Sequence, residues 1–353
     1  MGTVVRRRVR ADRCGAALAP LSAMGLAVVL VAARVNEGAS AACTVPTTLA
    51  LLARLTDGRA SERLRLMGLF EITSLVGIIA GYLVAGVAWD ALGWAAFLLL
   101  PAAYGTAWYL ARHVQGEVAQ PSSRHPGVRR AFRELFAAPG APSFIVAWLA
   151  VNAVVGVWVQ QAPYLLKLSV RSSTQTLVGG YSGREIGVVF AVWGLTFLIG
   201  IGAWSVLGAR RSRRRTMMIA LVGMFAVVAS LAGVNHGVSR AVLLGVAVIG
   251  VLVESGFTPA AFAHLANVTD TNEASRGATM GVYSLLLGAG QLAGAAIGAP
   301  FAARWQMDGV LACTALLATV SLIGVARMRS DARPSSPRDV RRSVGPPANS
   351  SAS

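Results

Sequence analysis

Four ionisable residues stand inside long apolar stretches of the sequence. They are Arg34, Glu37, Glu71 and Glu254. An ionised side chain in the middle of a bilayer costs about 2.5–3.5 kcal/mol on insertion scales, so it needs a partner or a water-filled path. We therefore take these four residues as candidates for proton coupling or for binding a solute.

Arg34 and Glu37 are three positions apart, which places them on one helix face and allows an ion pair. Their alternative role is a structural ion pair at an outer turn between two short helices. Glu254 follows a Val-Leu-Val run, where a protonated carboxyl is cheaper to bury than a carboxylate. It suits a proton carrier or a seat for a cationic solute. The alternative is an interhelical hydrogen bond to a serine or threonine.

Other candidate residues have simpler structural interpretations. Glu71 and His264 lie near helix ends, where pairing with a loop arginine or interfacial packing explains them. Gly77, Gly81, Gly290 and Gly294 are spaced four apart in pairs, so they permit close helix packing or act as hinges. The aromatic residues of the apolar segments either line a cavity or form belts at the membrane interfaces. Four of them are Trp148, Trp158, Tyr164 and Trp193.

Several classes of chemistry lack their motifs. The sequence has no P-loop, nucleophile elbow, His-Glu-x-x-His element or paired metal-ligand spacing, which argues against ATP-driven transport and membrane hydrolysis. Cys14, Cys43 and Cys313 are scattered and indicate neither a disulfide framework nor a zinc site. We expect no enzymatic activity, no cofactor and no metal.

The elements that carry the candidate residues read as membrane helices. Of 353 residues, 55% are hydrophobic and 13% charged, against roughly 25% charged in soluble domains. Ten apolar segments are each close to the ~20 residues that cross a bilayer. The sequence thus predicts an all-α polytopic protein with about ten transmembrane helices. The segments are 14–33, 35–55, 66–89, 91–111, 143–166, 186–207, 217–234, 241–263, 279–303 and 309–326.

The net charge of +17 indicates membrane topology and not nucleic-acid binding, because the arginines lie in short clusters between apolar segments. Twenty-six basic residues fall at the termini and in one set of alternating connections, and five fall in the other set. This asymmetry predicts a multi-pass plasma-membrane protein with both termini in the cytoplasm. Its partners would be the lipid bilayer, a small-molecule substrate and protons.

The segments group into five parts. These are a basic N-terminus (1–13), an incomplete first helix bundle (14–111), a cytoplasmic central loop (112–142), a six-helix bundle (143–327) and a disordered tail (328–353). An internal repeat supports two related halves, because residues 46–81 match residues 259–294 at twelve positions without a gap. The pair Gly77 and Gly81 matches Gly290 and Gly294, so we expect a parallel duplication.

Short motifs add a family resemblance. Arg34-Val-Asn-Glu37-Gly38, the loop Thr56–Arg63, the glycines after Gly77, the turn Trp89–Trp94 and the basic loop Gly208–Arg215 occur in this order. Together they resemble the major facilitator superfamily. The resemblance implies two bundles that rock about a midplane site, with Arg34 linked to proton movement and Glu37 as its neighbour. It also implies a cytoplasmic loop motif at Asp57, Arg63, Gly208, Arg213, Asp270 and Arg276.

The sequence departs from the family pattern at its start. The cluster Arg6–Arg8 stands where the loop after the second helix is expected, so we expect that the first two of twelve helices are missing. The stretch Ala11–Gly15 offers a second interpretation as a family loop motif, without its two following arginines. Tyr82 replaces a proline after Gly81, which weakens an antiporter assignment.

The predicted function is secondary active transport by alternating access. We expect proton-coupled efflux of a small amphipathic or cationic solute. The alternative is a non-transporting truncated membrane protein, or a helical subunit of a membrane assembly.

Overall fold

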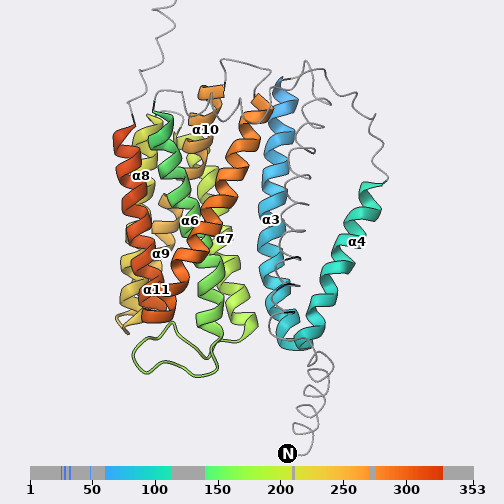
Figure 1. Cartoon of the computed structure of the whole chain (residues 1–353), viewed down its shortest axis with the longest axis vertical. Helices are drawn as coiled ribbons and strands as arrows, with labels where there is room; N and C mark the ends of the chain where they lie inside the picture. The colour runs from blue at the N-terminus through green and yellow to red at the C-terminus, as the bar shows by residue number, and fades with distance from the viewer. Residues whose placement is uncertain are drawn as a thin grey trace, which may run out of the picture. The chain divides into compact units, whose positions relative to one another are not determined.

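The computed structural model describes residues 60–112, 140–208, 211–269 and 276–328, together with Gly25, Val28, Ala32 and Thr48. The chain divides into two compact units, Met1–Met67 and Gly68–Ser353. Nearly all described residues belong to the second unit. The elements of the described ranges are helices (Figure 1): α3 (Ala60–Leu92), the 3₁₀-helix η1 (Gly93–Leu98), α4 (Leu99–Ala111), α6 (Ala141–Lys167), α7 (Gly183–Leu207), α8 (Arg213–Asn235), α9 (Arg240–Glu254), α10 (Phe257–Thr269) and α11 (Arg276–Arg327).

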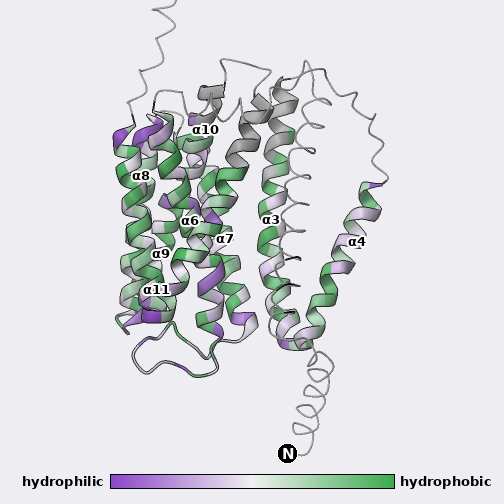
Figure 2. Cartoon of the chain, in the orientation of Figure 1, coloured by the Kyte–Doolittle hydropathy of each residue, from purple (hydrophilic) through white to green (hydrophobic). Residues whose placement is uncertain are grey.

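Six helical stretches of the described residues are long and apolar enough to cross a membrane. Figure 2 shows hydrophobic residues along most of their length. They are Ile72–Ala111, Ala141–Lys167, Gly183–Leu207, Arg213–Asn235, Arg240–His264 and Leu285–Arg327. The prediction of an all-helical membrane protein is confirmed at this level. The first two predicted segments, 14–33 and 35–55, lie outside the described ranges except for the four isolated positions.

Two of these stretches turn back in their middle. Ile72–Ala111 reverses at η1, where Gly93 has φ 56°, so that α3 and α4 run in opposite directions (Figure 1). Helix α11 breaks at Gln306, whose φ of 53° and ψ of −128° are not helical. Gly309 then returns so close to the Phe301 carbonyl that a Cβ there would overlap it. Each stretch therefore supplies two antiparallel arms.

The core lies where α6 packs along both arms of α11, with α8 and α10 beside them. Fully buried side chains from α6, α8 and α11 meet there, including Phe144, Met217, Leu221, Val310 and Cys313. Most of the buried apolar side chains of the described helices lie in this contact, so it contributes most of their packing energy.

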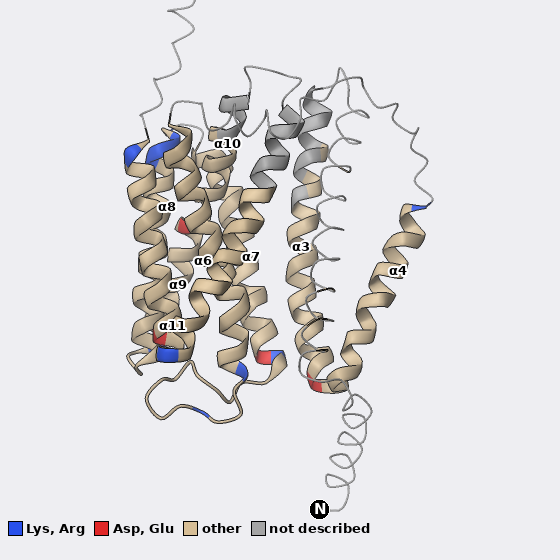
Figure 3. Cartoon of the chain, in the orientation of Figure 1, with Lys and Arg blue, Asp and Glu red and all other residues tan. Residues whose placement is uncertain are grey.

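The second unit has two distinct ends. At the basic end, α8 begins beside the last turn of α11, and the Arg214 guanidinium donates to the Ala326 carbonyl. At the loop end, the segment Leu168–Ser182 joins α6 to α7. Figure 3 shows the charged residues gathered mainly at these two ends. Five basic residues lie at the loop end. They are the five that the sequence analysis assigns to the set of connections with few basic residues, namely Lys167, Arg171, Arg184, Arg240 and Arg304.

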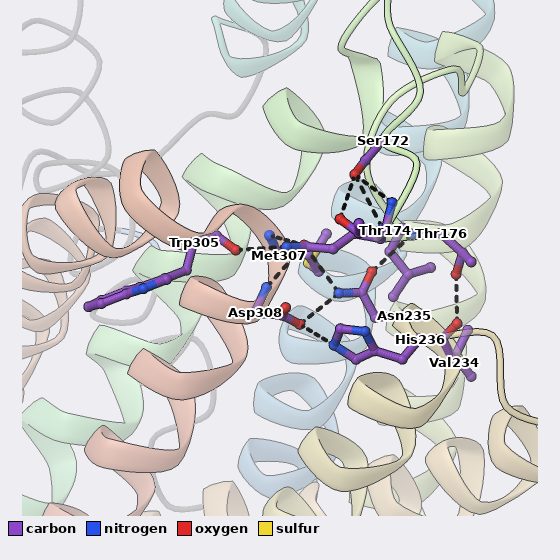
Figure 4. Close-up of polar contacts among 11 residues, drawn as sticks. Ser172, Thr174, Thr176, Val234, Asn235, His236, Trp305, Met307 and Asp308 are labelled. Carbon is purple, nitrogen blue, oxygen red and sulfur yellow. Dashed lines mark hydrogen bonds and ion pairs between the residues drawn. The ribbon is translucent and has the colours of Figure 1, made fainter.

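A polar network of Gln175, Asn235, His236 and Asp308 fastens the loop end (Figure 4). Gln175 Oε1 accepts from Met307 N at 3.0 Å and from Asn235 Nδ2 at 3.2 Å. Asn235, which is fully buried, also donates to Asp308 Oδ1 at 2.8 Å and accepts from Leu177 N at 3.0 Å. His236 Nε2 lies 3.1 Å from the same Asp308 oxygen. The network satisfies backbone groups that the turn of α11 leaves unpaired.

Candidate functional site

The apolar segment predicted as one helix over 241–263 is broken in its middle. Helix α9 ends at Glu254 and α10 begins at Phe257, so Ser255 and Gly256 separate two helices within one membrane stretch. Glu254 is fourteen residues from Arg240 and ten from His264. At 1.5 Å per residue, its Cα is roughly 15 Å from the nearer end of the stretch.

Residue types explain the break. Pro259 has no N–H, so the Ser255 carbonyl loses its helical donor, and the proline ring crowds that carbonyl. The backbone tightens just before it, because Gly256 N donates to the Val253 carbonyl at 3.2 Å. Helix α10 then starts with a bond of 3.4 Å from Ala260 N to the Gly256 carbonyl.

Helices α7 and α8 hold the broken segment on two sides. Trp204 Nε1 of α7 donates to the Leu252 carbonyl at 2.9 Å, and its ring lies against Gly256. The buried Ser255 hydroxyl donates to the same carbonyl at 2.8 Å and fills the space beside Gly200. On the other side, a Cβ at Gly223 of α8 would lie 2.8 Å from Glu254 N. The break is therefore a packed feature.

Glu254 as a whole residue is partly buried. No hydrogen bond or ion pair to it occurs among the residues that the structure describes. The nearby Ser255 hydroxyl is directed to the Leu252 carbonyl. The sequence analysis gives an interhelical hydrogen bond to a serine or threonine as the structural alternative for Glu254. Ser255 does not make such a bond to Glu254. An ionisable group at a discontinuous helix is a typical arrangement for ion and substrate sites in transporters.

The glycine pair of α11 lies in a close helix crossing. A Cβ at Gly290 would lie 2.8 Å from the Asn152 Cβ, and a Cβ at Gly294 would overlap the Ala153 carbonyl. Gly156 of α6 approaches Gln291 equally closely. This geometry accounts for the two glycines by packing, and their hinge role stays a prediction.

The matching pair of α3 has a different environment. A Cβ at Gly77 or Gly81 would meet no atom within 4 Å among the described residues. Farther along α3, Gly86 approaches the Gly183 carbonyl of α7 so closely that a Cβ would overlap it. The close backbone contacts of α3 with α7 thus involve Tyr82 and Gly86 and not the predicted pair.

The remaining predicted residues are only partly accessible to structural description. Arg34, Glu37, Asp57 and Asp270 lie outside the described residues. For Glu71 and Arg63 in α3 and Arg276 in α11, the structure describes the helix backbone and not the side chain. Gly208 caps the end of α7, and Arg213 begins α8 at the basic end.

The structure also identifies polar residues that the sequence analysis did not select. Asn152 is buried in α6 and donates to the Trp148 carbonyl at 2.9 Å. Trp148 is buried as well, with Phe262 of α10 against its ring, so it is not an interfacial belt residue. Asp90 bridges to α6 and α7. The position of Asn152 within an apolar segment could have marked it as a buried polar residue. No such sequence signal marks Asp90, which the sequence places in the turn 89–94.

Comparison with known families gives one result. A family model described as Major Facilitator Superfamily matches residues 173–350, slightly more than half of the chain. Among curated proteins, no relative of this chain is found. The matched region begins in the loop Leu168–Ser182 and covers α7 to α11, including the break at Glu254.

Proposed function

The chain belongs to the major facilitator superfamily, and from this premise we propose that it is a secondary active transporter that exports a small solute in exchange for protons. Family membership indicates transmembrane transport. The coupling ion, the direction and the solute class are our proposals. They rest on the position of Glu254, the helix break beside it and the charge asymmetry of the two ends.

The basic end faces the cytoplasm in this proposal, and the chain resides in the plasma membrane with both termini inside. The supporting observation is the distribution of arginines. Arg213, Arg214, Arg215 and Arg327 lie where α8 begins and α11 ends. Positive residues near helix ends are retained on the cytoplasmic side during insertion.

Glu254 is the proton carrier in this proposal, and the single observation that carries it is its place at the break between α9 and α10. A carboxyl group held in a helix bundle is neutral when protonated and needs a counter-charge when ionised. Binding a cationic solute or a proton at the same carboxylate makes the two mutually exclusive. This competition is the simplest physical basis for exchange, and it favours an amphipathic cation as the exported solute.

Arg34 and Glu37 remain proposed partners in proton movement. Their assignment rests on the family resemblance and on their spacing of three residues. Glu71 is proposed as a further coupling residue because it is an ionisable residue inside an apolar stretch. The role proposed for Glu254 does not depend on Arg34, Glu37 or Glu71.

The direct test is flux in proteoliposomes that contain the purified chain. Ethidium serves as the amphipathic cation, and internal pyranine reports protons. A pH gradient should drive ethidium accumulation, and ethidium addition should move protons in the opposite direction. Absence of both fluxes for ethidium and for a panel of other cations would favour the non-transporting alternative.

Variants of Glu254 sharpen the test. Glu254→Gln keeps the shape but removes both the titratable proton and the counter-charge of the cation, so gradient-driven accumulation should be lost, and any remaining downhill ethidium exchange should be weaker and independent of pH. Glu185→Gln is the matched control, because Glu185 lies at the start of α7 and, among the residues that the structure describes, bonds only within its own capping turn. The control should retain gradient-driven accumulation. Equal accumulation in both variants would exclude Glu254 as the proton carrier.

A further inference from the structure

Helices α3 and α7 touch along a narrow strip that runs inward from the loop end. Gly86 lies against the Gly183 carbonyl, and a Cβ at Gly187 would come within 2.6 Å of the Tyr82 carbonyl. One turn farther, the rings of Tyr82 and Phe190 have centroids 5.0 Å apart. The glycines let the two backbones meet directly over this short distance.

Asp90 closes the strip at its outer end, one turn beyond Gly86. Its Oδ1 accepts from Gly183 N at 2.9 Å and from Lys167 Nζ at 3.1 Å. Its Oδ2 accepts from Arg184 N at 2.7 Å. A single carboxylate of α3 therefore holds the last residue of α6 and the first turn of α7.

The first turn of α7 is capped from two sources. Ser182 and Glu185 form a capping box, in which the Ser182 hydroxyl accepts from Glu185 N at 3.1 Å. This box leaves the N–H groups of Gly183 and Arg184 for Asp90. A helix N-terminus carries about half a positive charge, so a carboxylate placed there gains both hydrogen bonds and favourable electrostatics.

The contact joins the two halves of the molecule and remains open to water. Helix α3 precedes the central segment 112–142, and α6 and α7 follow it. The side chains of Asp90 and Lys167 are 30% and 42% exposed. Water can replace each of these bonds when the helices separate, so breaking the contact strands no buried charge. The contact is thus suited to forming and breaking repeatedly.

We propose that Asp90 is a latch that holds α3 against α6 and α7 at the loop end, and that its release permits this end to open during transport. The latch rests on the proposed alternating access for its purpose, although its effect on the helix contact is independent of any solute. The glycine strip supplies the close fit, and Asp90 supplies the polar bond that favours the closed arrangement.

The test is a distance measurement between spin labels in the full-length chain. Ala95→Cys in η1 and Ser173→Cys in the loop Leu168–Ser182 place labels on exposed positions of the two sides. The three native cysteines are replaced by alanine in this background. Purified protein is measured without solute and without a gradient, so the result does not depend on transport.

Asp90→Ala should raise the ratio of separated to closed labels roughly two- to fivefold, the size expected for a lost charge at a helix terminus. Asp90→Asn should raise it less, because the amide oxygen still accepts one bond. Lys167→Met removes only the ion pair and should have the smallest effect of the three. Elution as a single species at an unchanged position shows that each variant is folded.

Glu185→Gln is the matched control, since it removes a negative charge from the same helix start and leaves the hydrogen bonds of Asp90 in place. Thr319→Val is a second control, because Thr319 is exposed in α11 and its hydroxyl donates to the Ala315 carbonyl of the same helix. Both should keep the parent distance distribution. If Asp90→Ala and Asp90→Asn gave the same spin-label distance distribution as the two controls, the proposed latch would be overturned. A parent chain without flux, but with the expected distances, would count against the proposed transport and not against the latch.

Discussion

Two helix crossings in this molecule both rely on glycine, yet they differ in what surrounds the glycines. Between α6 and α11, Gly156 and Gly294 meet backbone atoms, and buried side chains continue the contact on both sides. Between α3 and α7, Gly86 and Gly187 also approach backbone carbonyls, but less closely than Gly156 and Gly294 do. Neighbouring side chains of α3, such as Val84 and Val87, are more than half exposed among the described residues.

The polar bonds of the two crossings differ in the same way. Those of α6 and α11 lie inside the packing, where Trp158 Nε1 donates to Thr314 at 3.0 Å and Ser321 donates to the Ala147 carbonyl at 3.2 Å. Those of α3 and α7 lie at the solvent-accessible end, on Asp90. The first crossing has the features of a permanent contact, and the second has those of a separable one.

The largest effect on stability should come from Gly294→Val. The added side chain would overlap the Ala153 carbonyl, and α11 cannot move away without losing its other contacts with α6. We expect a loss of about 3 kcal/mol in the free energy of unfolding, measured by titration with a denaturing detergent. An unfolding curve equal to that of the parent would mean that this crossing is loose.

A smaller loss should follow Thr314→Val, which keeps the shape and removes the acceptor of Trp158 Nε1. Thr314 is buried, so no water replaces its hydroxyl readily. We expect a loss of about 1–2 kcal/mol by the same titration. Thr319→Val is the control, because Thr319 is exposed and its one bond within the described ranges runs to Ala315 of its own helix.

Gly86→Ala should open the separable crossing without unfolding the chain. The new methyl group would overlap the Gly183 carbonyl, but α3 can shift outward. We expect a loss of below about 1 kcal/mol in unfolding free energy, since few buried contacts are given up. The spin-label distance between positions 95 and 173 should lengthen clearly. Unfolding as severe as that of Gly294→Val would contradict the distinction between the two crossings.

The smallest effect should come from Tyr82→Leu. This change keeps an apolar contact with Phe190 and removes the ring pair at 5.0 Å. Aromatic pairs contribute about 0.5–1.5 kcal/mol beyond their buried area, and the lower limit applies to a half-buried ring. We therefore expect Tyr82→Leu to lower the free energy of unfolding by about 0.5 kcal/mol in the detergent titration. If Tyr82→Leu lowered it more than Thr314→Val does, the α3–α7 contact would have to be classed as permanent.

The sequence predicts most of the described membrane helices well, because a membrane helix is recognised from the residues that form it. The segment 186–207 corresponds to α7 at Gly183–Leu207, and 143–166 corresponds to α6 at Ala141–Lys167. The apolar run 241–263 does not predict the break that the structure shows, although Pro259 lies within it. Apolar length overrode the local effect of a proline that cannot donate a backbone bond.

The site could be predicted only in part. Glu254 was selected because an acid in an apolar run is costly, which is a local property. The bond from Asp90 to α7 joins residues 93 and 94 positions apart, and the meeting of Gln175, Asn235 and Asp308 joins three separate elements. Such contacts depend on how helices pack, which hydropathy and spacing do not determine.

Cys313 has a practical consequence for kinetics. Its thiol lies fully buried in α11 within the α6–α11 core. A thiol reagent reaches it only when these helices come apart, so at a reagent concentration where modification outpaces reclosing, the reaction rate equals the opening rate. In a chain with Cys14→Ala and Cys43→Ala, the slow modification of Cys313 becomes a clock for the lifetime of the permanent crossing.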